Sequence, residues 1–283
     1  MKVTVADKSS RQHLHHAESY ALSASLKLPL THEIEPHGHA RLLEDGKYVS
    51  HKLESFRHEG IVSYRSAFTH VVGGRDDKPG HGWNTLSTSV IEGLNILEVV
   101  TADRIVAQIA TEHPLVGYVP SVTFLGTRFE NLCIGGYPVK VDLDLNMLGS
   151  KPKKDAAYSS DRDFAKRVKG HYERIRSQRD VPPEVAARYK QLNATSKGQR
   201  LVECSLVKQV EGGYPGRNFG HVIDVPNFGK VYLATVRIDE SDFNGNTPKK
   251  TLITLKMLEV KMGCLASGSM DVGVGKTNGV GTP

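Results

Sequence analysis

Histidine is the residue type whose spacing most directly suggests chemistry. Ten of the 13 histidines lie within the first 81 residues, and two pairs follow the pattern His-x-His: His13 with His15, and His37 with His39. Alternate residues of a β-strand share a face, so each pair would present two imidazoles to one metal ion. Imidazole suits Zn, Cu, Ni or Fe. One hypothesis is therefore a transition-metal site, in a metal-binding protein or a metal-dependent hydrolase. The alternatives are histidines on solvated or edge strands, or a pH-sensitive assembly surface.

The positive charge of the chain is concentrated in residues 150–200. That segment holds 14 Lys and Arg against 6 Asp and Glu, while the whole chain carries a net charge of +6. Such a patch attracts phosphates, an acidic lipid surface or an acidic protein. The predicted contact residues of this segment are Lys166, Arg167 and Arg174. The alternative is a helix with a solvated charged face, docked on a sheet or on a neighbouring subunit.

The single tryptophan, Trp83, follows a Gly-rich loop. A loop aromatic can stack on a sugar or anchor a protein interface, so Trp83 is a candidate residue of a carbohydrate-binding module. The alternative is that its side chain closes the end of a β-sandwich.

The C-terminal run GVGKT, residues 273–277, contains most of a phosphate-binding loop. The first glycine of the motif would have to stand at position 270, which is Met270. The residues after Thr277 are rich in Gly and end in Pro, so they do not predict the helix whose N-terminus would complete a phosphate site. We therefore predict no nucleotide site, and interpret the run as a flexible Gly-rich tail or a last edge strand.

Composition places the chain among soluble globular proteins, with 39% hydrophobic and 24% charged residues. No run approaches the roughly 18 apolar residues of a membrane helix. The N-terminus has no apolar segment typical of a secretory signal, so a cytoplasmic location is the default expectation. Cys133, Cys204 and Cys264 form no C-x-x-C pair and are predicted to be small buried hydrophobes. No cofactor is predicted apart from the transition metal considered above.

Alternating apolar residues and Gly-rich turns predict a mainly β fold. Strands are expected at 19–28, 60–72, 84–92, 102–111, 199–210 and 250–263. Three short strands are expected within 119–146, and a hairpin about the turn PNFG at 220–239. A short strand or turn is expected at 94–100, because Gly93 interrupts the pattern. The predicted fold class is an antiparallel β-sandwich or barrel-like domain with a small two-helix insert.

Both helices are predicted between the two β-rich parts. Ser160 and Asp163 resemble a capping box, and an apolar stripe follows at Phe164, Val168, Tyr172 and Ile175. Pro182 and Pro183 open a second helix at 183–192. The chain is therefore divided into 1–149, the N-terminal part of the β core; 150–198, the basic helical insert; and 199–283, the C-terminal part of the same core with its Gly-rich tail.

Three stretches of small and apolar residues carry a family resemblance: Val100–Ala107, Phe129–Val139, and Leu255–Ser269 around Cys264. They resemble a family of bacterial hypothetical proteins without an assigned activity and, more distantly, the secreted β-rich proteins called choice-of-anchor P. The resemblance implies a β-rich fold and brings no catalytic residues.

Three functional hypotheses follow. The first is a non-enzymatic binding or self-assembling protein, whose partners are further copies of itself or an acidic protein or surface bound through residues 150–198. The second is the metal site at the N-terminal histidines. The third is carbohydrate binding through Trp83.

Overall fold

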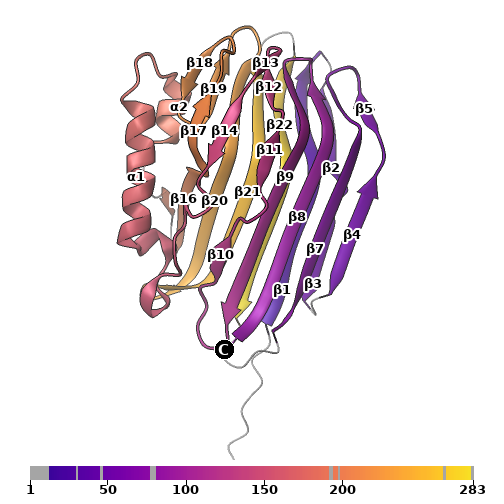
Figure 1. The fold of residues 1–283 in the computed structure, drawn as a ribbon. Helices are drawn as coiled ribbons and strands as arrows, with labels where there is room; N and C mark the ends of the chain where they lie inside the picture. The colour runs from indigo at the N-terminus through magenta and orange to yellow at the C-terminus, as the bar shows by residue number, and fades with distance from the viewer. Residues whose placement is uncertain are drawn as a thin grey trace, which may run out of the picture.

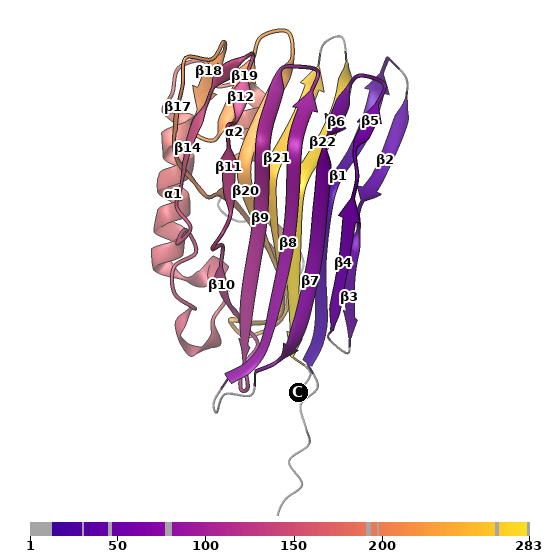
Figure 2. The same cartoon turned by 45° about the vertical axis from the view of Figure 1, so that its right-hand side comes forward.

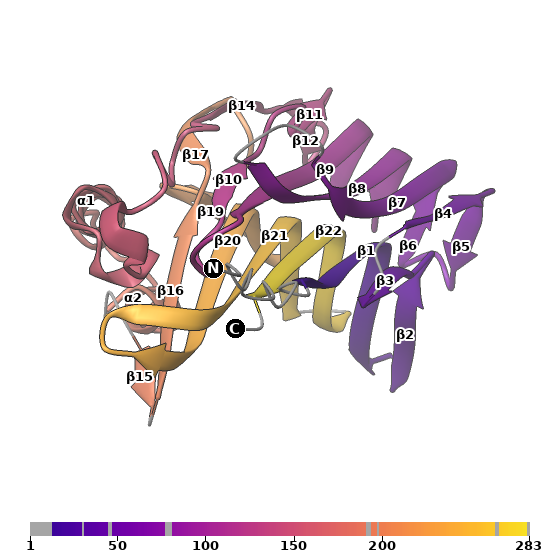
Figure 3. The same cartoon turned by 90° about the horizontal axis from the view of Figure 1, so that it is seen from below.

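A computed structural model describes residues 13–29, 31–44, 47–76, 81–190, 194–196, 198–263 and 266–281. Two antiparallel sheets face each other as two layers, and two α-helices stand along one side (Figures 1 and 3). The sheets are not closed into a barrel. Of the two predicted architectures, a sandwich and a barrel-like domain, the structure therefore shows the sandwich. No helix of the described residues is long and apolar enough to cross a membrane.

Sheet A is formed by both ends of the chain. Its main path runs β15 (Ala194–Ser196), β16 (Gln199–Ser205), β20 (Gly229–Asn244), β21 (Thr247–Gly263), β22 (Ser267–Gly281), β1 (His13–Leu28) and β2 (His32–His37). Beside this path, β3 (Ala40–Glu44) pairs with β1 and β19 (Val222–Val225) with β20, while β18 (Arg217–Phe219) pairs with β19.

Sheet B is formed by the intervening residues. Its long central strands are β7 (Ser66–Arg75), β8 (His81–Ile96) and β9 (Val100–Pro114), with β4 (Tyr48–Leu53), β5 (Phe56–His58) and β6 (Val62–Tyr64) toward one edge. At the other edge, β9 pairs with β10 (Ser121–Thr123), β11 (Arg128–Glu130) and β12 (Cys133–Ile134), and β12 with β13 (Tyr137–Pro138). A separate two-stranded sheet joins β14 (Lys140–Leu143) to β17 (Val207–Glu211).

Strands β8 and β9 confirm the predicted strands at 84–92 and 102–111. The expected break at Gly93 is wrong, because β8 continues to Ile96 and turns at Leu97 and Glu98. Gly93 has a φ of +65°, and a Cβ there would lie 2.9 Å from the Cβ of Arg65. The glycine thus relieves a close approach within the strand and does not end it.

The Gly-rich C-terminal run is neither a tail nor an edge strand. It forms β22, which pairs with β21 on one side and β1 on the other. A Cβ at Gly275 would lie 3.1 Å from Ser87 of sheet B, and one at Gly273 would lie 3.3 Å from Ile105. These glycines let the two layers approach closely, so the sequence feature is explained by packing.

The helices lie beside β16 and β20 (Figure 1). Before them, 3-10 turns occupy Lys153–Asp155 and Tyr158–Ser160; α1 covers Arg162–Arg176 and α2 covers Pro183–Arg188. The predicted cap is wrong by one residue: Asp161, and not Ser160, accepts the hydrogen bond from the backbone N–H of Phe164 at 2.8 Å. The predicted stripe is confirmed, since Phe164, Val168, Tyr172 and Ile175 are all buried.

Candidate functional site: a groove across sheet B

The predicted metal ligands His37 and His39 diverge. Gly38 between them has a φ of +66°, which ends the alternation of the strand. His37 Nδ1 is hydrogen-bonded to the hydroxyl of Tyr64. His39 Nε2 instead lies 3.4 Å from the Glu18 carboxylate, on a different strand. The two imidazoles therefore do not face a common point.

The other histidine pair lies at the start of β1, where the side chains of His13 and His15 fall outside the described part of the structure. The neighbouring His16 approaches Glu18 to 3.4 Å. Burial alone would raise the pKa of Glu18, but the charges of Lys276 and His39 lower it below its usual value. Among the described residues, no group of three or more His, Cys, Asp or Glu side chains is placed to hold a metal ion.

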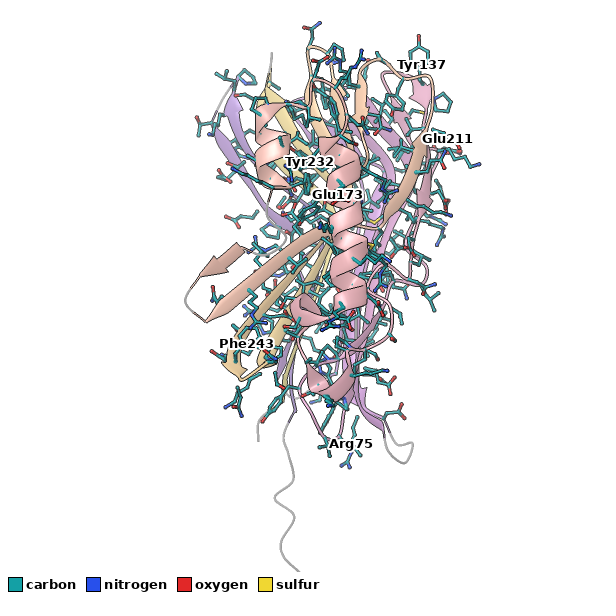
Figure 4. The ribbon with its side chains drawn as sticks, turned by 90° about the vertical axis from the view of Figure 1, so that its left-hand side faces the viewer. Arg75, Tyr137, Glu173, Glu211, Tyr232 and Phe243 are labelled. Atoms are coloured by element: carbon teal, nitrogen blue, oxygen red, sulfur yellow. The ribbon has the colours of Figure 1, made fainter. Side chains whose placement is uncertain are left out.

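The three predicted basic contacts on α1 have different surroundings. Arg167 donates to the backbone carbonyls of Met147 and Leu148, both at 2.8 Å, so it fixes the helix to the chain before it. Lys166 and Arg174 are exposed. The outward face of α1, which carries the labelled Glu173, lies toward the viewer in Figure 4. Lys166 and Arg174 therefore stay predicted contacts, whereas Arg167 has a structural role.

Trp83 is half-buried near the start of β8, opposite His113 of β9. Its neighbour Asn84 is exposed on the outer face of sheet B, so the alternation of the strand directs Trp83 toward sheet A. Trp83 therefore does not line the groove described below.

A buried cluster of titratable side chains joins the helices to sheet A. His171 Nε2 of α1 lies 2.8 Å from His221 Nδ1, and His221 Nε2 lies 2.6 Å from the hydroxyl of Tyr189. Burial, and then the charge of Arg174, lowers the pKa of His171 to about 4. Burial, followed by the charges of His171 and Arg188, lowers the pKa of His221 still more clearly. Both imidazoles are therefore neutral near pH 7.

Arg188 extends this cluster along sheet A. Its two terminal nitrogens donate to both carboxylate oxygens of Glu259, at 2.8 and 2.7 Å, and its Nε donates to Glu203. The guanidinium also lies 4.3 Å from the ring centre of Tyr232. Burial alone would raise the pKa of Glu259, but the hydrogen bonds from Arg188 hold it below its usual value. These groups are satisfied by one another, which is the arrangement of a structural polar network.

A cavity crosses the outer face of sheet B. Its volume is about 560 Å³, and we call it the sheet B groove. The strand register aligns one apolar row across the sheet, formed by Val72, Leu86 and Ala110. Tyr48 of β4 extends this row, and its side chain is 60% exposed.

Polar side chains flank the apolar row on both sides. On one side the register places Asn84, Glu112 and Ser121 in line. On the other side lies Gln108, in line with Thr88. The amide nitrogen of Asn84 donates to Asp76 at 3.0 Å, which fixes the orientation of this carboxamide. The groove is therefore an apolar floor between two polar margins.

One wall of the groove is formed by the loop that carries Leu125, whose side chain is 69% exposed. The loop is fixed to β9 through Thr127, whose hydroxyl donates to the carbonyl of Gln108 at 3.0 Å and accepts from its N–H at 3.1 Å. Gly126 has a φ of +90°, a backbone conformation that favours glycine, and its Cα lies close to the side chain of Gln108. The wall is held rigidly against the strand.

A family model described as Domain of unknown function (DUF8256) matches residues 13–239, about four fifths of the chain. No curated protein and no solved structure matches the chain.

Proposed function

Because the chain belongs to the DUF8256 domain family, whose function is unknown, we propose from its own residues that the protein is a non-enzymatic carbohydrate-binding protein. The ligand is an oligosaccharide that lies in the sheet B groove and crosses the strands. One observation carries this proposal: the apolar row of Val72, Leu86 and Ala110 runs between two rows of polar side chains.

The chemistry of a sugar chain fits this pattern. A pyranose ring has an apolar C–H face and hydroxyl groups along its edges. The apolar row supports the face, while the carboxamides of Asn84 and Gln108 and the carboxylate of Glu112 are suited to hydrogen-bond the hydroxyls. Tyr48 adds an exposed aromatic ring at the end of the row, where a further sugar ring can stack. A few polar groups around an apolar floor are typical of ligand sites.

The number of carboxylates in the groove favours sugar binding over sugar hydrolysis. Glycosidases commonly use a pair of carboxyl groups on either side of the scissile bond. Among the residues that line the described groove, Glu112 is the only carboxylate. The carboxylates Glu203 and Glu259 belong instead to the network with Arg188. We therefore propose that the groove binds a sugar chain and does not cleave it.

The test is to screen the purified protein on a glycan array and then measure affinity by calorimetry for Gly74→Leu. Gly74 lies beside Asn84 on the outer face, and a Cβ there would meet no atom within 4 Å. Leucine can therefore enter the groove without disturbing the strand. Gly213→Leu is the matched control, since its Cβ would also meet no atom within 4 Å and it does not line the groove.

We expect Gly74→Leu to weaken glycan binding about tenfold or more, equivalent to about 1.4 kcal/mol, and Gly213→Leu to leave it unchanged. If no glycan binds, or if both variants bind like the unmodified protein, the proposal is wrong. A dimer that dissociates only in Gly74→Leu would assign the groove to a second copy of the chain instead.

A further inference from the structure

We propose a second ligand site, at the end of the sandwich where turns of the two sheets meet. It is a pocket of about 390 Å³, and we call it the turn pocket. Its ligand is a small amphipathic amine, with an apolar body inside the pocket and an ammonium group at the rim. This site is independent of the carbohydrate proposal, because the turn pocket and the sheet B groove share no lining residue.

The pocket is lined mainly by apolar side chains from both layers. Sheet B contributes Ile61, Leu97 and Val99, and the turns of sheet A contribute Phe228, Pro29 and Ala266. Ile61, Phe228 and Ala266 are almost completely buried and form the floor. In Figure 2 the β8–β9 turn lies at the upper end of the molecule, whereas β10, beside the sheet B groove, lies toward the lower end. The volume and the apolar lining fit a small-molecule site.

The turn that carries Leu97 has an unusual backbone. Leu97 and Glu98, its two central residues, have φ values of +50° and +58°. Such a turn favours Asn-Gly, because both positions require the left-handed conformation. A leucine held there is strained, and strain of this kind gathers at ligand sites. The N–H of Leu97 donates to the carbonyl of Ile61 at 2.9 Å, which fixes the strained turn to a residue of the pocket floor.

Two polar residues determine the kind of ligand. Glu59 and Asn227 line the pocket, both with positive φ and both in turns, and their side chains are exposed. A carboxylate and a carboxamide oxygen are both hydrogen-bond acceptors. The negative charge of Glu59 favours a cationic head and disfavours an anionic one. An apolar amine meets both requirements, and a fatty acid does not.

The first experiment compares octylamine, 1-octanol and octanoate by calorimetry on the full chain. The apolar body is the same in all three, so differences in affinity report the head group. We expect the amine to bind most tightly and the carboxylate about tenfold or more weaker than the amine. Glu59→Gln should remove the difference between amine and alcohol. Absence of binding by all three, or an order that favours octanoate, would overturn the proposal.

Two substitutions in the same turn separate binding from folding. Leu97→Asn removes the apolar wall and places a residue that tolerates the left-handed conformation, so octylamine affinity should fall several-fold while the denaturation midpoint stays or rises. Glu98→Gly relieves the same strain at a residue that does not line the pocket, so it should raise the midpoint and preserve affinity. Equal affinity of both variants and the unmodified protein would contradict the site.

Discussion

Polar side chains are bonded to one another on the covered side of sheet A, whereas they line an open groove on the outer face of sheet B. Between the helices and sheet A, His171, His221 and Arg188 bond to groups of the protein and are largely withdrawn from water. Across sheet B, the carboxamides of Asn84 and Gln108 line an open cavity beside an apolar floor. The groups with strongly perturbed pKa values are thus bonded to one another inside the fold, whereas the proposed recognition groups of sheet B are mainly uncharged carboxamides. Strongly perturbed pKa values accompany structural ion-pair networks as well as active sites, and here they accompany such a network.

The largest predicted effect is the loss of Arg188. Arg188→Met keeps the side-chain volume but leaves the buried Glu259 without its bidentate partner. Removing one partner of a buried ion pair costs about 3–5 kcal/mol. We expect a loss of about 3 kcal/mol in the free energy of unfolding, measured by urea denaturation. Arg237→Met is the control, because its partner Asp239 is more exposed and the expected loss is below about 1 kcal/mol. Equal losses would mean that the network contributes no more than a surface pair.

The second prediction concerns pH. The pKa of His171 is about 4 in the folded chain and 6.5 when unfolded, so between these values the unfolded state binds more protons. The contribution of His171 to the free energy of unfolding should therefore be fully present above pH 6.5. It should fall as the pH drops toward 4, by up to about 3 kcal/mol. The free energy of unfolding, measured at a series of pH values, checks this.

His171→Asn isolates the contribution of that imidazole. Burial also lowers the pKa values of His37, His70 and His221. These imidazoles are present in both proteins, so their contributions to the slope cancel in the comparison. Between pH 6 and 4.5 the slope of stability against pH should be smaller in the variant by about 1.4 kcal/mol per pH unit at most. Identical slopes would show that His171 is protonated in the folded protein.

Local patterns in the sequence predict many elements of this fold. The features that these patterns do not predict depend on neighbouring strands that are distant in the sequence. The central parts of β8 and β9 and the apolar stripe of α1 follow from residue pattern and β propensity, whereas the strand expected at 60–72 is divided into β6 and β7. The place of β22 between two strands does not, because Gly273 and Gly275 signal flexibility locally and close packing only once sheet B is present.

The candidate site was harder to predict for the same reason. Val72, Leu86 and Ala110 are far apart in sequence and align only through the register of three strands. Trp83 and Asn84 are adjacent in sequence but face opposite sides, so a register known in advance would have favoured Asn84. The histidine pair at 37 and 39 was separated by the positive φ of Gly38.

A third prediction tests the groove wall. Thr127→Val removes a buried hydroxyl that both donates to and accepts from the backbone of Gln108. The N–H of Gln108 then lacks its acceptor, and we expect a loss of about 1–2 kcal/mol by urea denaturation. The wall at Leu125 should also loosen, so glycan affinity should fall. Thr88→Val, on the same face and outside the wall, should change stability by less than about 0.5 kcal/mol. Lost stability with unchanged affinity would separate the wall from the binding site.

The smallest effect is expected at Gly170, in the middle of α1. A Cβ there would meet no atom within 4 Å, and the position is helical. Gly170→Ala should therefore raise the free energy of unfolding by about 0.5–1 kcal/mol, since glycine loses more backbone entropy on folding. Lys169→Ala, at the next exposed position, is the control for a change in surface composition. If the variant is more stable and its mass in light scattering is unchanged, Gly170 is needed neither for folding nor for assembly. If the unmodified chain self-associates and only Gly170→Ala loses that assembly, the gap above Gly170 accommodates a second copy, and the helical side of the molecule has an outer contact surface as well as a buried network.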